Sequence, residues 1–189
     1  MRHGHARFVG ALRRARRPST ALTCLVLAAA GAAQAHITLE TAQAPAGSYY
    51  KAVFRVGHGC DGSPVRQLVV EIPPGVRGAK PMVKPGWRID IQRARLDTPY
   101  DSHGHTVTED VSQVRFSGGP LPDAYYDEFA LMAQLPEQPG PIYWKVAQLC
   151  EKGRVDWVEI PAAGQSLHDL KAPAALLDVV PNEHAGHVH

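Results

Sequence analysis

The residues best suited to bind a metal ion lie where an N-terminal export signal ends. Four arginines within residues 13–17 precede an apolar run over residues 21–33, and Ala33-Gln34-Ala35 has the small residues of a cleavage site. Cleavage after Ala35 would make His36 the first residue, with a free α-amine and a ring Nδ1 that can close one chelate ring. Cu(II) favours such nitrogen ligands. The sequence predicts a signal peptide over residues 1–35 and a copper site created by its removal. The alternative is that one of the 10 histidines falls at this position by chance.

The charge of the chain changes when the predicted signal peptide is removed. The 20 basic and 18 acidic residues give a net charge of +2, but six arginines and no acidic residue lie in residues 1–35, which leaves about −4. A mildly acidic protein without a basic run lacks the electrostatic footprint of nucleic-acid binding. No second apolar run of membrane-spanning length follows, so we expect no membrane anchor after cleavage. The predicted location is the periplasm or the extracellular space.

Two cysteines remain after Cys24 is lost with the signal peptide. Cys60 and Cys150 form a single pair in a chain destined for an oxidising compartment, which favours a disulfide. The alternative is a thiolate copper site.

The rest of the chain has the pattern of an all-β protein. Short alternating segments are separated by Pro- and Gly-rich turns, and no stretch holds a helical period. This pattern predicts a single domain over residues 36–165, an antiparallel β-sandwich with Greek-key connections of the immunoglobulin or cupredoxin type. Residues 166–189 are expected to be a flexible tail, ending in His184, His187 and His189. The predicted strands cover residues 36–41, 49–56, 66–72, 87–92, 111–117, 125–135, 142–149 and 154–160.

Alternation within these strands predicts which side chains are buried. One core face carries Leu68, Val70 and Ile72, and another carries Trp87, Ile89 and Ile91. Trp157 has two interpretations. Its place in the alternation could let it line a site, or the indole could pack beneath a loop.

Three motifs together resemble the YcnI-like family of bacterial envelope proteins. The resemblance covers about residues 36–165 and implies a β-sandwich linked to copper homeostasis, with copper held by the N-terminal histidine in a monohistidine brace. It assigns the brace to His36 and places Trp157 beside the copper. The motifs are Ala35-His36-Ile37-Thr38-Leu39-Glu40, then Gly57-His58-Gly59-Cys60-Asp61-Gly62 with Pro81-Met82-Val83-Lys84-Pro85-Gly86-Trp87, and finally Tyr126-Asp127-Glu128-Phe129 with Gln148-Leu149-Cys150-Glu151-Lys152-Gly153.

The chain departs from this family at the third copper ligand. Better-known members have a glutamate at the end of the strand that here reads Phe54-Arg55-Val56, but this chain continues with His58 and has no acid before Asp61. We expect His58 to replace the carboxylate, and the alternatives are Asp61 or Glu40.

Other side chains are weaker candidates for roles near a metal. Glu128 could orient a metal-bound imidazole, because ligating histidines usually donate their other N–H to a carboxylate or carbonyl. His103 and His105 could form a second, weak site, although an exposed histidine pair in a loop is more often simply solvated.

These observations predict a non-enzymatic periplasmic protein, a chaperone or buffer that holds Cu(II). Its partner would be another periplasmic or membrane copper protein. One alternative is a copper oxygenase, because two imidazoles and an amine would imitate an oxygen-activating histidine brace. The other is a metal-free envelope interaction domain.

Overall fold

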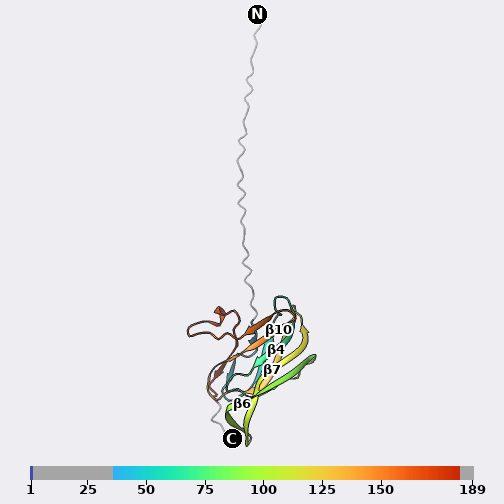
Figure 1. The fold of residues 1–189 in the computed structure, drawn as a ribbon. Coiled ribbons are helices and arrows are strands. Elements are labelled where there is room, and N and C mark those ends of the chain that lie inside the picture. Colours follow the sequence, from blue (N-terminus) through green and yellow to red (C-terminus); the bar gives the residue numbers. More distant parts are fainter. Residues whose placement is uncertain (2–35, 184–189) are drawn as a thin grey trace. The chain divides into compact units, whose positions relative to one another are not determined.

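The computed structural model describes Met1 and residues 36–183 (Figure 1). The predicted signal peptide, apart from Met1, and the last three histidines lie outside these residues. No helix in the described part is long and apolar enough to span a membrane.

The described chain forms three β-sheets, which confirms the all-β prediction. The four-stranded sheet has the order β1-β3-β8-β5, the five-stranded sheet β11-β10-β4-β7-β6, and the smaller sheet β2-β12-β9. Every strand pair is antiparallel except β2 with β12. The strands are β1 (Thr38–Leu39), β2 (Gln43–Pro45), β3 (Tyr49–Val56), β4 (Val65–Glu71), β5 (Arg77–Pro81), β6 (Trp87–Ser102), β7 (His105–Leu121), β8 (Asp127–Gln134), β9 (Gly140–Trp144), β10 (Val146–Cys150), β11 (Arg154–Trp157) and β12 (Ala175–Val180).

The core lies between the four-stranded and five-stranded sheets. Phe129 of β8 meets Phe116 of β7 with their ring centroids 5.3 Å apart, and both rings are buried. The predicted core residues Leu68 and Val70 are fully buried on β4. Ile72, Trp87 and Ile89 are partly buried and pack against the core, whereas Ile91 is 47% exposed on the edge strand β6. The two facing sheets form the predicted antiparallel β-sandwich.

The β6–β7 hairpin is much longer than the alternation predicts. Its strands continue to a tight turn at His103 and Gly104, where φ is 52° and 79°. Two consecutive residues with positive φ are typical of a two-residue hairpin turn. Most side chains in the outer half of β6 are exposed, so this half carries no apolar alternation to reveal it. His103 therefore lies in an exposed turn, and His105 directly follows that turn.

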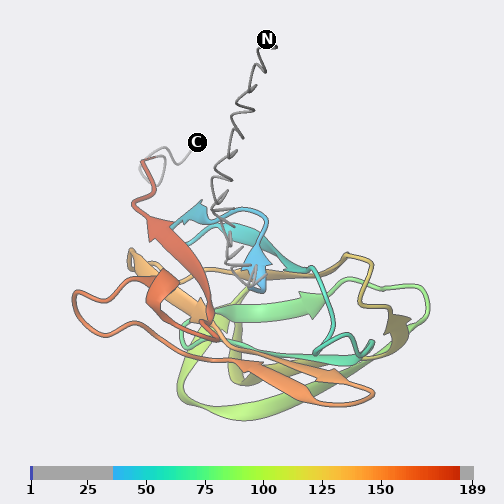
Figure 2. The same cartoon turned by 90° about the horizontal axis from the view of Figure 1, so that it is seen from above.

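The prediction of a flexible tail from residue 166 is wrong for most of that segment. A 3₁₀ helix, η1 (Leu167–Asp169), precedes β12, and β12 pairs with both β2 and β9. Figure 2 shows β12 beside the N-terminal strands, drawn in blue. Ala175, Leu177 and Val179 alternate inward and are buried. Pro173 and Pro181, which suggest a break in the strand pattern of the sequence, instead lie on either side of this strand.

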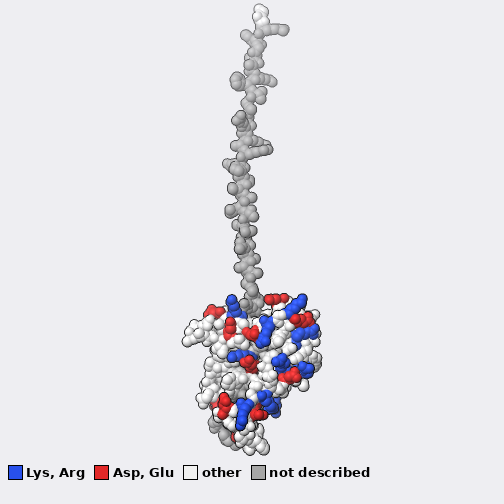
Figure 3. All heavy atoms as spheres, in the orientation of Figure 1, with Lys and Arg blue, Asp and Glu red and all other residues white. Residues whose placement is uncertain are grey.

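Surface charge is mixed on the face shown in Figure 3, where acidic and basic side chains are interspersed. The described residues include several exposed ion pairs, such as Arg55 with Glu40 at 3.4 Å. Such pairs contribute little to stability.

Tyr50 gives the fold a predicted sensitivity to alkali. Its hydroxyl donates to the Thr41 carbonyl at 2.6 Å, and burial, with the nearby charge of Glu40, raises the pKa of Tyr50 to about 12 from its usual 10.0. The unfolded tyrosine ionises first, so stability should be complete below pH 10 and fall as the pH rises through 12. Urea unfolding between pH 9 and 12 measures this fall, and Tyr50→Phe should make it shallower. An equally steep fall in the variant would contradict the assignment.

Candidate metal centre

Strand pairing places His36 beside the His58 loop. β1 pairs with β3 so that Thr38 is opposite Arg55 and Leu39 is opposite Phe54. Continuing this antiparallel register by two residues sets His36 opposite Gly57, which precedes His58 in the chain. Ile37 is 2% exposed and anchors the start of β1 in the core. His36 therefore occupies a defined position at the first residue of the fold.

The His36 ring lies against the indole of Trp157. Their centroids are 5.7 Å apart at an interplanar angle of 61°, an edge-to-face arrangement. Trp157 ends β11, the edge strand of the five-stranded sheet, and is only 4% exposed. The indole is thus part of the core and also contacts the His36 ring, and its place beside a metal ion stays a prediction.

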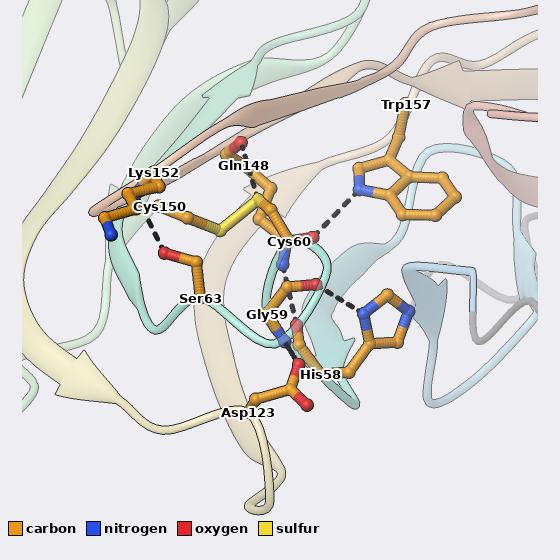
Figure 4. Close-up of a disulfide and its surroundings, with 9 residues drawn as sticks. All are labelled: His58, Gly59, Cys60, Ser63, Asp123, Gln148, Cys150, Lys152 and Trp157. Carbon is orange, nitrogen blue, oxygen red and sulfur yellow. Dashed lines mark hydrogen bonds between the residues drawn. A yellow bond between two sulfur atoms is a disulfide. The ribbon is translucent and has the colours of Figure 1, made fainter.

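A buried glutamine joins Trp157 to the His58 loop. Gln148 is 1% exposed, its Oε1 accepts from Trp157 Nε1 at 3.0 Å, and its Nε2 donates to the His58 carbonyl at 2.7 Å (Figure 4). A buried amide with both ends satisfied fixes its neighbours, because breaking either bond would leave a buried polar group unpaired. The sequence analysis missed Gln148. The pattern that could have identified Gln148 is a polar residue on the same inward face of β10 as the apolar Val146.

The loop that carries His58 is held at several points. Gly59 N donates to Asp123 Oδ1 at 2.8 Å, and Cys60 exchanges two backbone hydrogen bonds with Ser63. A disulfide joins Cys60 to Cys150 at the end of β10. A Cβ on Gly59 would lie 1.9 Å from the Ser63 carbonyl oxygen, so this close approach requires glycine. Figure 4 shows these contacts around one compact turn.

The ring of His58 has a backbone carbonyl as a neighbour. Its Nδ1 lies against the Gly59 carbonyl oxygen, which can only accept a hydrogen bond. A backbone carbonyl acting on one ring nitrogen is the usual support for a histidine that binds metal through the other. The nitrogen donors of His36 and His58 fit the preference of Cu(II).

The candidate carboxylates lie in other surroundings. Glu40 and Glu128 both approach Arg55, at 3.4 and 3.7 Å, and Glu128 also accepts from the Tyr126 hydroxyl. In the strand register, Arg55 on β3 lies between Thr38 on β1 and Glu128 on β8. A role for Glu128 in orienting a metal-bound imidazole therefore stays a prediction. Asp61 is an exposed turn residue with φ of 48°.

Side chains alone do not complete a metal site in the described part of the chain. No group of three or more His, Cys, Asp or Glu residues there has an arrangement that could hold a metal ion. Within residues 36–183, an ion at His36 would therefore find no third side chain of these types arranged to bind it.

An open cleft of about 460 Å³ has His36 among its lining residues, most of which are apolar. One wall is formed by residues 36–39 and by Ala42 and Gln43. The other wall is formed by η1 and the start of β12, including His168 and Asp178.

Comparison with known proteins gives a family but no established activity. A family model described as a domain of unknown function, DUF1775, matches residues 36–179. No curated protein matches the chain significantly. A solved structure of an uncharacterized protein from Nocardia farcinica, described as an immunoglobulin-like fold, is similar with a TM-score of 0.59 and 21% identity over 76% of this chain and 97% of that chain. At this identity the likeness shows the fold alone. Because the family model spans most of the sequence and begins at His36, the chain belongs to the DUF1775 family, the YcnI-like family that its motifs resemble.

Proposed function

We propose that this protein binds Cu(II) in the cell envelope and passes it to another copper protein. The α-amine and imidazole of His36 hold the ion after the signal peptide is removed, and the His58 imidazole is the third protein ligand. Copper is cargo in this proposal, and no catalytic turnover is assigned to the protein.

The observation that carries the proposal is the position of His36. The family match begins at this residue, and its ring packs on buried Trp157. Continuing the β1–β3 register sets His36 opposite Gly57, beside the loop that carries His58. Cleavage at Ala35 would add an amine to two imidazoles, a donor set that suits tetragonal Cu(II).

Copper titration of the chain that begins at His36 tests the function. We expect one equivalent of Cu(II) to bind and to quench tryptophan fluorescence, because Trp157 contacts the His36 ring. Trp157→Phe should lose most of the quenching while keeping the stoichiometry, since an indole is not a ligand here. Absence of binding to the chain that begins at His36 would refute the proposed function. Oxygen-dependent turnover by the loaded protein would favour the oxygenase alternative.

The identity of the third ligand is a separate prediction. Electron paramagnetic resonance of the Cu(II) form should show coupling to two inequivalent imidazole nitrogens, and His58→Ala should remove one of them. Asp61→Ala is the matched control on the same loop and should change little. A spectrum altered by Asp61→Ala or Glu40→Ala, but not by His58→Ala, would instead assign the third position to a carboxylate.

A further inference from the structure

The edge strand β6 has one side of its backbone open to another strand. Among the described strands β6 pairs only with β7, and Figure 1 shows it at the end of the row β10, β4, β7, β6. Just before β6, the Gly86 carbonyl accepts from Gly119 N at 3.3 Å, so the even-numbered residues here direct their backbone groups toward β7. Hydrogen-bonding direction alternates along an antiparallel strand. The N–H and C=O groups of Ile89 and Ile91 therefore point to the open edge.

The side chains of this edge alternate between an apolar face and a charged face. Trp87 and Ile89 pack against the core from the inner face of the sheet, and Ile91 follows them on that face but is exposed. On the outer face Arg88 and Asp90 are exposed, with Arg88 Nε 3.3 Å from Asp90 Oδ2. An open strand edge beside exposed apolar side chains is a template for pairing with another strand.

Apolar surface continues from this edge onto the segment that precedes β6. An open hollow of about 500 Å³ is lined by Val83, Lys84, Pro85, Trp87 and Ile89. Val83 is 85% exposed, whereas the charge of Lys84 is already paired with the Asp127 carboxylate at 2.7 Å. The hollow therefore offers mainly apolar contact to a strand that lies along β6.

The charges of this edge fit a second copy of the same chain. Residues 87–91 read apolar, basic, apolar, acidic, apolar. When two copies run antiparallel about a two-fold axis at Ile89, Arg88 lies opposite Asp90 of the second copy and Trp87 lies opposite its Ile91. Opposite charges and apolar pairs directly across two strands are stabilising, and like charges are destabilising. Moving the axis by one residue, to Arg88 or Asp90, would instead place a charge opposite itself.

We propose that two copies of this protein associate by antiparallel pairing of their β6 edges, centred on Ile89. The two Ile89 residues exchange N–H···O bonds, and Ile91 N donates to the Trp87 carbonyl of the other copy. Trp87 N already donates to the Lys84 carbonyl at 3.1 Å, so the ladder ends at that turn. The pairing joins two five-stranded sheets into one and covers the exposed Ile91.

This interface goes beyond the proposed function and is separate from the candidate metal centre. β6 is at one edge of the five-stranded sheet, and β11, which ends at Trp157, is at the other. The dimer therefore leaves the Trp157 side of each copy open, and its formation needs no metal.

Charge reversal at the paired positions tests the interface. Analytical ultracentrifugation of the chain that begins at His36, in EDTA so that no metal can bridge two copies, should show a concentration-dependent dimer. Arg88→Asp makes both charged positions of the edge acidic, and Asp90→Arg makes both basic. Each variant alone should raise the dimer dissociation constant at least about tenfold, because both cross-strand pairs become repulsive. An equimolar mixture of the two variants should restore parent-like affinity as a heterodimer.

A matched control lies on the opposite edge of the same sheet. Arg154 and Asp156 form an exposed ion pair on β11, with Arg154 Nε 2.7 Å from Asp156 Oδ1, and Arg154→Asp should dimerise like the parent. A parent that stays monomeric throughout the concentration series would refute the dimer. Parent-like dimerisation of Arg88→Asp would exclude the β6 edge. Failure of the two weakened variants to associate on mixing would refute the antiparallel register. Circular dichroism verifies that each variant is folded, and none of these outcomes bears on copper binding.

Discussion

A chain that begins at His36 is expected to bind Cu(II) at least about 100-fold more tightly than the same chain with one extra glycine before His36. The added residue converts the chelating α-amine into an amide and leaves both imidazoles in place. Loss of groups that only support a metal ligand already costs 10–100-fold in affinity, so loss of a ligand should reach at least the upper end of that range. Competition titration against a chelator of known affinity measures the difference.

The pH dependence provides a second signature of the amine. An α-amine has a reference pKa of about 7.7–8.0 and must lose its proton to bind, so affinity should fall as the pH decreases through and below that range. The glycine-extended chain has no amine at this position and should lack this component. A chain extended by one glycine at its C-terminus is the control for added length. Equal affinity of the two N-terminal forms would exclude the amine as a ligand.

The sequence predicted the parts of the site that depend on local pattern. Alternation with turn residues located the strands that carry Leu68, Val70 and Phe116. The cleavage motif singled out His36, whose role as a metal ligand stays a prediction. The β-sandwich followed because many short strands with polar turns can bury their apolar faces only against another sheet.

Features that depend on pairing between distant strands were not predictable in this way. The amide of Gln148 matters because β10 brings it between Trp157 and the His58 carbonyl, a contact that spans 90 residues of sequence on one side. The sequence predicted no strand in the segment containing β12, because its prolines are evident in the sequence. The strands that pair with β12 are β2 and β9, which are far away in the chain. The cleft shared by His36 and His168 exists only after that pairing has formed.

Removal of the Cys60–Cys150 disulfide should lower the free energy of unfolding more than any other substitution proposed for this protein. The bond connects residues 90 positions apart. In the chain-entropy account, closing a loop of this length restricts the unfolded chain enough to stabilise the fold by roughly 4–5 kcal/mol. The double variant Cys60→Ser with Cys150→Ser should lower the free energy of unfolding by up to about that amount. Urea unfolding of the oxidised parent and the double variant measures the loss.

Copper binding distinguishes this structural role from thiolate ligation. The His58 loop keeps the Gly59–Asp123 and Gln148–His58 hydrogen bonds, so the double variant should still bind one equivalent of Cu(II) at low temperature, where it remains folded. Thiol titration of the denatured, unreduced parent should find no free sulfhydryl among Cys60 and Cys150. Loss of copper stoichiometry from a double variant that is folded by circular dichroism would instead assign a cysteine to the metal. Unchanged stability would mean that the remaining backbone contacts of the loop already impose the constraint attributed to the disulfide.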